Sequence, residues 1–185
     1  MKRMLKGPLY LVGGFFALIL IVAAIGAFTK GQSGANNSQV DSQFTESDGT
    51  AAPIGKIVTV RSDLTVAVTQ VEKPESISSS RGATLAPEGG KLVIVYLKVG
   101  NTGSDSGDML RTQFRLTDSQ GRTYDELLTP EESGTVNLWS QDRGLDDSAS
   151  QISPGDSINI AKVFRVAANA EGLRLVVNEK MLAIE

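Results

Sequence analysis

The stretch Lys91–Met109, KLVIVYLKVGNTGSDSGDM, decides the fold class of this chain. It begins with a run of strand-favouring residues from Leu92 to Val99 and then breaks into Asn101-Thr102-Gly103 and a small, acidic segment. Side chains alternate across a strand, so one side of this run is fully aliphatic, while the other, from Leu92 to Lys98, grows more polar toward its end. The pattern predicts a central strand whose exit lies near solvent. Asn and Gly both tolerate left-handed backbone angles, which is enough to explain the break as a turn.

The remainder of the chain repeats this strand-and-turn pattern. Further strands are predicted in Lys56–Val60, Leu64–Val71, the hairpin Thr112–Leu127, Ser157–Val166 and Leu173–Val177. In the hairpin, Phe114 and Leu116 are expected to point inward, Asp118 to accept from backbone N–H groups two residues on, and Gly121 to supply the positive φ. The sequence offers no convincing amphipathic helix after the N-terminal segment, and parallel strands would need such crossovers. About seven short strands in about 130 residues therefore predict an all-β, antiparallel β-sandwich.

The first thirty residues have the features of a membrane anchor. Lys2, Arg3 and Lys6 precede an uncharged, mainly apolar run from Gly7 to Thr29. This run of about 23 residues is long enough to cross a bilayer core of about 30 Å, and a secretory signal usually has a shorter apolar region. The positive-inside rule keeps the basic end in the cytoplasm. Residues 1–30 are therefore expected to form a cytoplasmic stub and one transmembrane helix, with a cleaved signal at Ala24-Ile25-Gly26 as the alternative.

Two segments are expected after the anchor. Residues 31–53 are rich in Gly, Ser, Asn and Gln, with Phe44 as the only aromatic residue. Such a composition cannot bury enough apolar area to offset the entropy of ordering, so a disordered linker is predicted. Residues 54–185 are expected to form the β-sandwich domain. The predicted location is the cytoplasmic membrane, single-pass, with the domain on the extracytoplasmic side.

Charge and composition exclude several functions. Of the 18 Lys and Arg residues, four lie in residues 1–30, which leaves 14 bases against all 21 acids in the remainder of the chain. A body with this acidic balance repels phosphate backbones, so nucleic acid is not an expected partner. The chain has no Cys and no His, which removes thiolate chemistry, the commonest general base and the commonest transition-metal ligand. We therefore expect no enzyme activity, no cofactor and no metal site.

Three short motifs together resemble a known family. Their residues are Asn101, Thr102 and Gly103; Phe114, Leu116, Asp118, Gly121 and Tyr124; and Pro154, Gly155, Phe164 and Val166. Their order over about Ile54–Asn178 resembles a bacterial family of telokin-like, immunoglobulin-like extracytoplasmic domains, often tethered by a lipid or one membrane helix and largely of unknown function. The resemblance implies an immunoglobulin-like sandwich outside the cytoplasm. It brings no catalytic residues, and this chain has a helix anchor in place of a lipidated Cys.

The candidate binding residues lie in one long connection. Leu127–Gln151 spans about 25 residues, and a structureless loop of that length is often functional. We expect a short edge strand in TVNLW (residues 135–139). Trp139, the only tryptophan, is a candidate anchor, together with the carboxylates of Asp142, Asp146 and Asp147. This patch would favour a basic protein surface or a divalent cation. The alternative is that Trp139 packs over one end of the sandwich, with its indole N–H bonded to a carbonyl.

Two further loops have simpler interpretations. Asp105 and Asp108 offer only two carboxylates, whereas Ca²⁺ takes six to eight oxygen ligands, so a solvated loop is favoured there. Glu72–Gly90 is rich in Ser, Gly and Pro and is expected to be a second, mobile loop. The sequence thus predicts a non-enzymatic interaction module that binds a protein or cell-envelope component through long acidic loops. A small-ligand or Ca²⁺-binding extracytoplasmic protein is the alternative.

Overall fold

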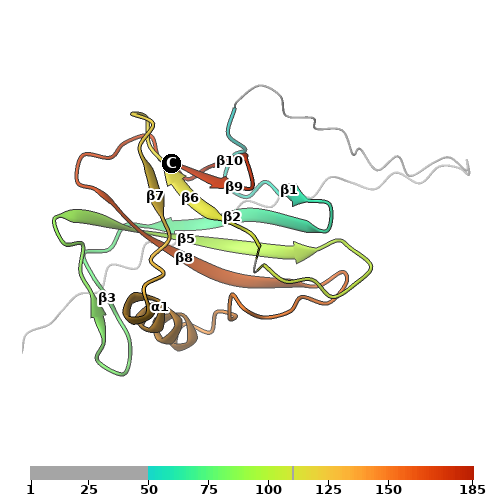
Figure 1. Ribbon diagram of the computed structural model, residues 1–185, viewed down its shortest axis with the longest axis horizontal. Coiled ribbons are helices and arrows are strands. Elements are labelled where there is room, and N and C mark those ends of the chain that lie inside the picture. Colours follow the sequence, from blue (N-terminus) through green and yellow to red (C-terminus); the bar gives the residue numbers. More distant parts are fainter. Residues whose placement is uncertain (1–49, 110) are drawn as a thin grey trace, which may run out of the picture. The chain divides into compact units, whose positions relative to one another are not determined.

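Two four-stranded antiparallel sheets pack face to face, and one helix lies on the outer face of the first sheet (Figure 1). The computed structural model describes residues 50–109 and 111–185. The strand orders are β1-β2-β5-β8 in the first sheet and β10-β9-β6-β7 in the second. The predicted antiparallel β-sandwich is therefore confirmed, but the domain is mostly β and not all-β, because it contains a helix.

The elements have the following bounds. The first sheet contains β1 (Val58–Arg61), β2 (Leu64–Glu72), β5 (Gly90–Asn101) and β8 (Ser157–Ala167). The second contains β6 (Phe114–Thr117), β7 (Thr123–Asp125), β9 (Arg174–Val177) and β10 (Lys180–Ala183). Two short strands, β3 (Ile77–Ser78) and β4 (Thr84–Leu85), form a separate hairpin, and α1 spans Pro130–Asp142.

Strand β5 is the interior strand that the run from Leu92 to Val99 predicts. It pairs with β2 on one side and with β8 along eleven residues on the other. Its inward residues, from Val93 to Val99, are fully buried between the sheets with Phe164 of β8 and Leu175 of β9. The strand stays straight across the whole domain in Figure 1, where it lies between the second sheet above and α1 below. At its far end Lys98 is exposed, so the predicted approach to solvent is confirmed.

The outer side of β5 begins apolar because a second core lies there. Its members are buried residues of the first sheet, the β3–β4 hairpin and α1: Ile77, Leu85, Leu92, Ile94, Leu127, Val136, Trp139, Ala161 and Val163. Both faces of β5 are thus covered over its first half, which accounts for a nearly continuous hydrophobic run instead of an alternating one.

Helix α1 corrects two expectations. TVNLW (residues 135–139) is part of this helix and not an edge strand, and the chain does contain a helix after its N-terminal segment. Thr129 is the N-cap and accepts from the Glu132 backbone N–H at 3.4 Å, Pro130 opens the first turn, and Glu131 and Glu132 favour its positive end. The buried stripe includes only two apolar residues, Val136 and Trp139, beside two hydroxyl residues. A stripe that weak does not stand out in the sequence.

The strand count and one loop also differ from the expectation. The segment Glu72–Gly90, predicted as a mobile loop, contains the β3–β4 hairpin, and its Ile77 and Leu85 are buried beside α1. The described residues form ten strands instead of about seven, because this pair and β10 were not predicted. The hairpin of β6 and β7 is confirmed, with Phe114 and Leu116 buried and Arg115 exposed.

The predicted anchor lies outside the described residues. No helix within residues 50–109 and 111–185 is long and apolar enough to span a bilayer. The predicted linker, residues 31–53, reaches the described part only at its end. There Ala52 is buried, and its backbone exchanges hydrogen bonds of 2.9 and 2.7 Å with Met181 and Ala183 on the edge strand β10.

Candidate functional site

The outer face of the first sheet is divided into a covered half and an open half. Helix α1 and the β3–β4 hairpin cover the first half of β5. Beyond them lies a groove of about 570 Å³. It is lined by Ile57, Thr65, Ala67, Lys98, Gly100, Asn101, Thr102, Gly103, Gly155, Asp156 and Ser157. This groove is the candidate functional site.

Small side chains form the floor of the groove. Across β2 and β5 the register pairs Thr65 with Gly100 and Ala67 with Lys98. A Cβ on Gly100 would lie 2.9 Å from the Thr65 hydroxyl oxygen, so a side chain there would crowd the floor. One wall is Ile57, whose side chain is 66% exposed although it is large and apolar. Lys98 adds one positive charge and Asp156 one negative charge. The site thus combines an apolar wall, hydroxyls, backbone groups, a cation and a carboxylate.

Asn101 holds the end of the groove together. Its side-chain nitrogen donates to the carbonyls of Asp105 at 2.7 Å and Ile152 at 2.8 Å, and its side-chain oxygen accepts from Gly103 N–H at 2.8 Å. Its own backbone bonds with Gly155 and Asp156. The Asn-Thr-Gly and Ser-Pro-Gly-Asp segments therefore meet at one buried amide.

This geometry corrects the expected reason for Asn101-Thr102-Gly103. Neither Asn101 nor Gly103 belongs to the described residues with positive φ, so left-handed tolerance does not explain them. Asn101 is required as a buried donor and acceptor, and it is 2% exposed. A Cβ on Gly103 would lie 3.0 Å from the Asp63 side chain, so Gly103 is required for close packing.

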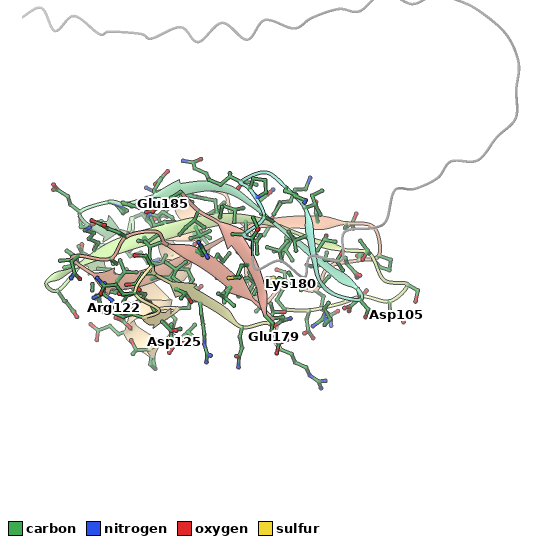
Figure 2. The ribbon with its side chains drawn as sticks, turned by 90° about the horizontal axis from the view of Figure 1, so that it is seen from above. Asp105, Arg122, Asp125, Glu179, Lys180 and Glu185 are labelled. Atoms are coloured by element: carbon green, nitrogen blue, oxygen red, sulfur yellow. The ribbon has the colours of Figure 1, made fainter. Side chains whose placement is uncertain are left out.

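A second polar centre lies at the other end of the domain. Figure 2 shows Asp105, in the loop that Asn101 holds, and Arg122, in the β6–β7 hairpin, at opposite ends. The carboxylate of buried Asp118 accepts from the backbone N–H groups of Gln120 and Arg122, both at 2.9 Å, and Gly121 has φ +77°, as predicted. Desolvation alone would raise the pKa of Asp118, but bonds from Arg122, the backbone and Tyr124 outweigh it and lower the pKa to about 2.

Trp139, the predicted anchor residue, is buried. Its side chain is 1% exposed and packs in the second core, so it is buried, as the alternative expects, but on the outer face of the first sheet and not at one end of the sandwich. The ring lies 6.2 Å from that of Tyr96, centroid to centroid, and the guanidinium carbon of Arg143 is 4.2 Å from its centroid. Trp139 therefore presents no bare aromatic surface.

The three predicted carboxylates contact separate partners. Asp142 accepts from Ser80, at 2.6 Å from the backbone N–H and 2.7 Å from the hydroxyl, and these bonds lower the pKa of Asp142. Asp146 bonds to Asn159 through both its backbone N–H, at 2.8 Å, and its carboxylate, at 2.7 Å, along the outer edge of β8. Asp147 accepts from Ala149 N–H within its own turn. Each side chain is exposed, yet each holds a local structure, and the structure does not join them into one ligand set.

Metal-ligand geometry is absent from the described part of the chain. Among residues 50–109 and 111–185, no three Asp or Glu side chains gather in a way that would hold a metal ion. Asp105 accepts from the Ser104 hydroxyl at 3.3 Å, and the carbonyl of Asp108 accepts from Arg61 at 3.0 Å.

Sequence reasoning missed two features. One is the groove itself, for which the only signals were the polar end of the outer side of β5 and an apolar residue, Ile57, at the start of a strand. The other is a nearly buried ion pair in which Lys162 lies 2.8 Å from Glu126 and 5.0 Å from the ring centroid of Phe114. Lys162 occupies an ordinary strand position, so nothing in the sequence distinguishes it.

Three solved structures are similar to this fold to different degrees. The structure resembles a conserved hypothetical protein from Bacillus anthracis, with a TM-score of 0.58, 17% identity, and coverage of 72% of this chain and 95% of that one. An uncharacterised β-sandwich protein from Clostridium difficile 630 has a TM-score of 0.49 at 8% identity, covering 77% and 100% of the two chains. A secreted protein from Mycobacterium tuberculosis, MPT63, has a TM-score of 0.47 at 14% identity, covering 72% and 95%. At 17% identity the first likeness shows the fold alone, and the other two likenesses, with TM-scores below 0.5, support no conclusion.

The family follows from the sequence match. No curated protein matches the chain. The model of a family described as a domain of unknown function, DUF4352, matches residues 52–184, which include both sheets, α1 and the groove. The chain belongs to the DUF4352 family.

Proposed function

We propose that this protein is a non-enzymatic interaction module, held on the outer side of the cytoplasmic membrane by its N-terminal helix, that binds an extended segment of a partner protein in the groove. The basic residues at 2, 3 and 6 and the apolar run to Thr29 support the anchor and its orientation. The resemblance to telokin-like, immunoglobulin-like extracytoplasmic domains supports the same location.

One observation carries the binding role: Ile57 remains 66% exposed beside an open groove on a rigid sheet. A concave site that combines an apolar side chain with a few polar groups has the composition of a ligand-binding site. The floor of Thr65, Ala67 and Gly100 is low enough for the backbone of an extended segment to approach the sheet. Lys98 and the Ser157 hydroxyl can donate to its carbonyl groups. The Thr65 hydroxyl donates to the Gly100 carbonyl at 3.2 Å, so it can accept from an N–H group of the segment.

Charge complementarity indicates the kind of partner. Residues 50–185 contain 18 acids and 14 bases, and residues 31–49 add three acids and no base. A segment with net positive charge is therefore attracted to this domain over a range of about a Debye length. The proposed ligand is an extended, basic segment of an extracytoplasmic protein or protein domain.

Site-specific photo-crosslinking tests the proposal in the full-length, membrane-inserted protein. A photoreactive residue replaces Ile57 in the groove or, as a matched control, exposed Arg174 on the second sheet. We expect a discrete crosslinked protein from position 57 and not from position 174. The substitution Ile57→Asp should abolish co-purification of that same protein, and Arg174→Asp should leave it unchanged.

Either of two results would exclude the groove as the binding surface. If position 174 crosslinks the same protein as position 57, or if the Ile57→Asp protein retains it, binding does not use this surface. Deleting Leu127–Gln151 would not be an informative test, because Val136 and Trp139 of that segment are part of the second core. Its deletion would unfold the domain irrespective of any partner.

A further inference from the structure

An arginine side chain covers the only tryptophan of the chain. The guanidinium carbon of Arg143 lies 4.2 Å from the ring centroid of Trp139, well inside the range of about 6 Å for a cation–π interaction. Trp139 is 1% exposed, whereas Arg143 is exposed, and α1 lies at the surface of the domain. Arg143 therefore lies between the indole ring and solvent.

Tyr96 and Glu72 complete the surroundings of this cation. The rings of Tyr96 and Trp139 are tilted by 49° with centroids 6.2 Å apart. Tyr96 lies opposite Gln70 of β2, and the amide of Gln70 donates to Glu72 at 2.7 Å, which fixes the carboxylate. Burial and then the nearby Glu72 raise the pKa of Tyr96, while Arg143 acts in the opposite direction. Two aromatic rings thus lie next to one positive charge, and the carboxylate of Glu72 lies near Tyr96.

Arg143 is weakly attached to this position. The ion pairs of the described residues do not include it. Its backbone N–H donates to Ser140 at the end of α1, and Gly144 follows with φ +68° and ends the helix. The aromatic rings, a side-chain interaction with the Tyr96 hydroxyl and the neighbouring charges hold the side chain, which remains exposed. A cation–π contact at such an exposed site is worth about 0.5–1 kcal/mol, so another cation can compete for the position.

The geometry points to a recognition pocket for an organic cation, formed by Trp139, Tyr96 and Glu72, in which Arg143 is an internal occupant that a guanidinium or alkylammonium side chain of a ligand displaces. In the structure the Arg143 side chain occupies this position over the Trp139 ring. Removal of that side chain exposes one aromatic face beside a second ring and a carboxylate, which is the arrangement that binds alkylammonium groups.

The pocket lies beside the groove. Its biological ligand, the basic segment, is inferred from the proposed function, so this part of the inference depends on that proposal. Tyr96 and Lys98 share the outer side of β5 two residues apart, about 7 Å along the strand, and Lys98 lines the groove. An extended basic segment in the groove would therefore present one cationic side chain at the pocket. The pocket would select segments by the position of that side chain.

The test uses full-length protein in detergent micelles and tetramethylammonium chloride as the probe. Because the chain has one tryptophan, its indole N–H cross-peak in a ¹H–¹⁵N spectrum monitors this pocket alone. Sodium chloride at equal concentration corrects for ionic strength. In Arg143→Gln we expect a saturable shift of the cross-peak. In the wild type the probe must displace the Arg143 side chain, so about two- to fivefold more probe should be needed for the same shift.

Controls make each outcome decisive. Arg81→Gln, a substitution of another exposed arginine, should behave as the wild type. In the Arg143→Gln background, Tyr96→Leu should abolish the shift. If Arg143→Gln unfolds, Arg143→Ala takes its place, because it also removes both the charge and the cover of the ring. A folded Arg143 variant that responds to tetramethylammonium no more than to sodium, or a response that survives Tyr96→Leu, overturns the pocket. If position 57 gives no crosslink but tetramethylammonium still shifts the indole cross-peak of Arg143→Gln, only the groove proposal is refuted.

Discussion

The hydroxyl of Tyr124 donates a 2.9 Å hydrogen bond to the carboxylate of Asp118, and Nε of Arg122 donates to the same oxygen at 2.6 Å. Two backbone N–H groups occupy the other oxygen. The spacing of Asp118, Gly121 and Tyr124 is therefore a structural device. One buried carboxylate closes the turn between β6 and β7 and ties the next strand to it.

Replacement of Asp118 should destabilise the fold more than loss of any one donor. Asp118→Ala leaves two backbone N–H groups, the Tyr124 hydroxyl and the Arg122 guanidinium without their acceptor in a buried setting. We expect thermal unfolding to begin lower, with Tm reduced on the order of 5–10 °C. Tyr124→Phe removes one bond and should cost about 1 kcal/mol. Equal losses in the two variants, measured by denaturant unfolding, would contradict a shared carboxylate.

Acid should remove the Asp118 contribution over a defined pH range. The pKa of Asp118 is lowered from 3.8 to about 2 in the folded protein. Below about pH 4 the Asp118 carboxylate therefore binds a proton in the unfolded chain, whereas in the folded chain it binds one only near pH 2. The stabilisation is complete above pH 4 and lost between pH 4 and pH 2. Comparison of wild type with Asp118→Asn at pH 6, 4, 3 and 2 should show a stability gap that narrows only below pH 4. A gap that is constant with pH would contradict the lowered pKa.

Local patterns in the sequence predicted the turns and most strands. Asp118 and Gly121 could be assigned because a turn depends on residues within about four positions of each other. The contacts of Asn101 could not, since its partner Ile152 is fifty-one residues away. Helix α1 was missed because its buried stripe is short of apolar residues, although Thr129, Pro130 and Glu132 form a helix-start signal. The groove depends on which half of a sheet a helix covers, which no local pattern specifies.

Substitution of Trp139 should mainly lower the stability of the fold, because the side chain is part of the core. The side chain is 1% exposed in the second core. Trp139→Ala should cost about 3–5 kcal/mol through lost burial and the cavity left behind, and Trp139→Phe should cost less. Urea unfolding monitored by circular dichroism checks this order. A Trp139→Ala protein as stable as the wild type would mean that the ring does not pack beneath α1.

A glycine inside α1 offers a stabilising substitution. Gly134 is an exposed helical residue, and a Cβ there would have nothing within 4 Å. Gly134→Ala should therefore raise the free energy of unfolding by about 0.5–1 kcal/mol, because Ala has the higher helix propensity. Gly90→Ala should instead lower the free energy of unfolding, because a Cβ there would lie 2.3 Å from the backbone oxygen of Val166. If Gly134→Ala lowers Tm, residue 134 is not in a helix.

Asn101 should tolerate no substitution that alters its hydrogen bonds, because it joins three segments around one buried amide. Asn101→Ala breaks the bonds to Asp105, Ile152 and Gly103, and three lost bonds should cost roughly 2–4 kcal/mol. Asn101→Asp keeps an acceptor for Gly103 N–H but sets a charged oxygen against two carbonyls, so it should be worse than Ala despite its similar shape. Chemical denaturation of both variants gives the order. If Asp is tolerated better than Ala, the amide nitrogen is not the group that holds this end of the groove.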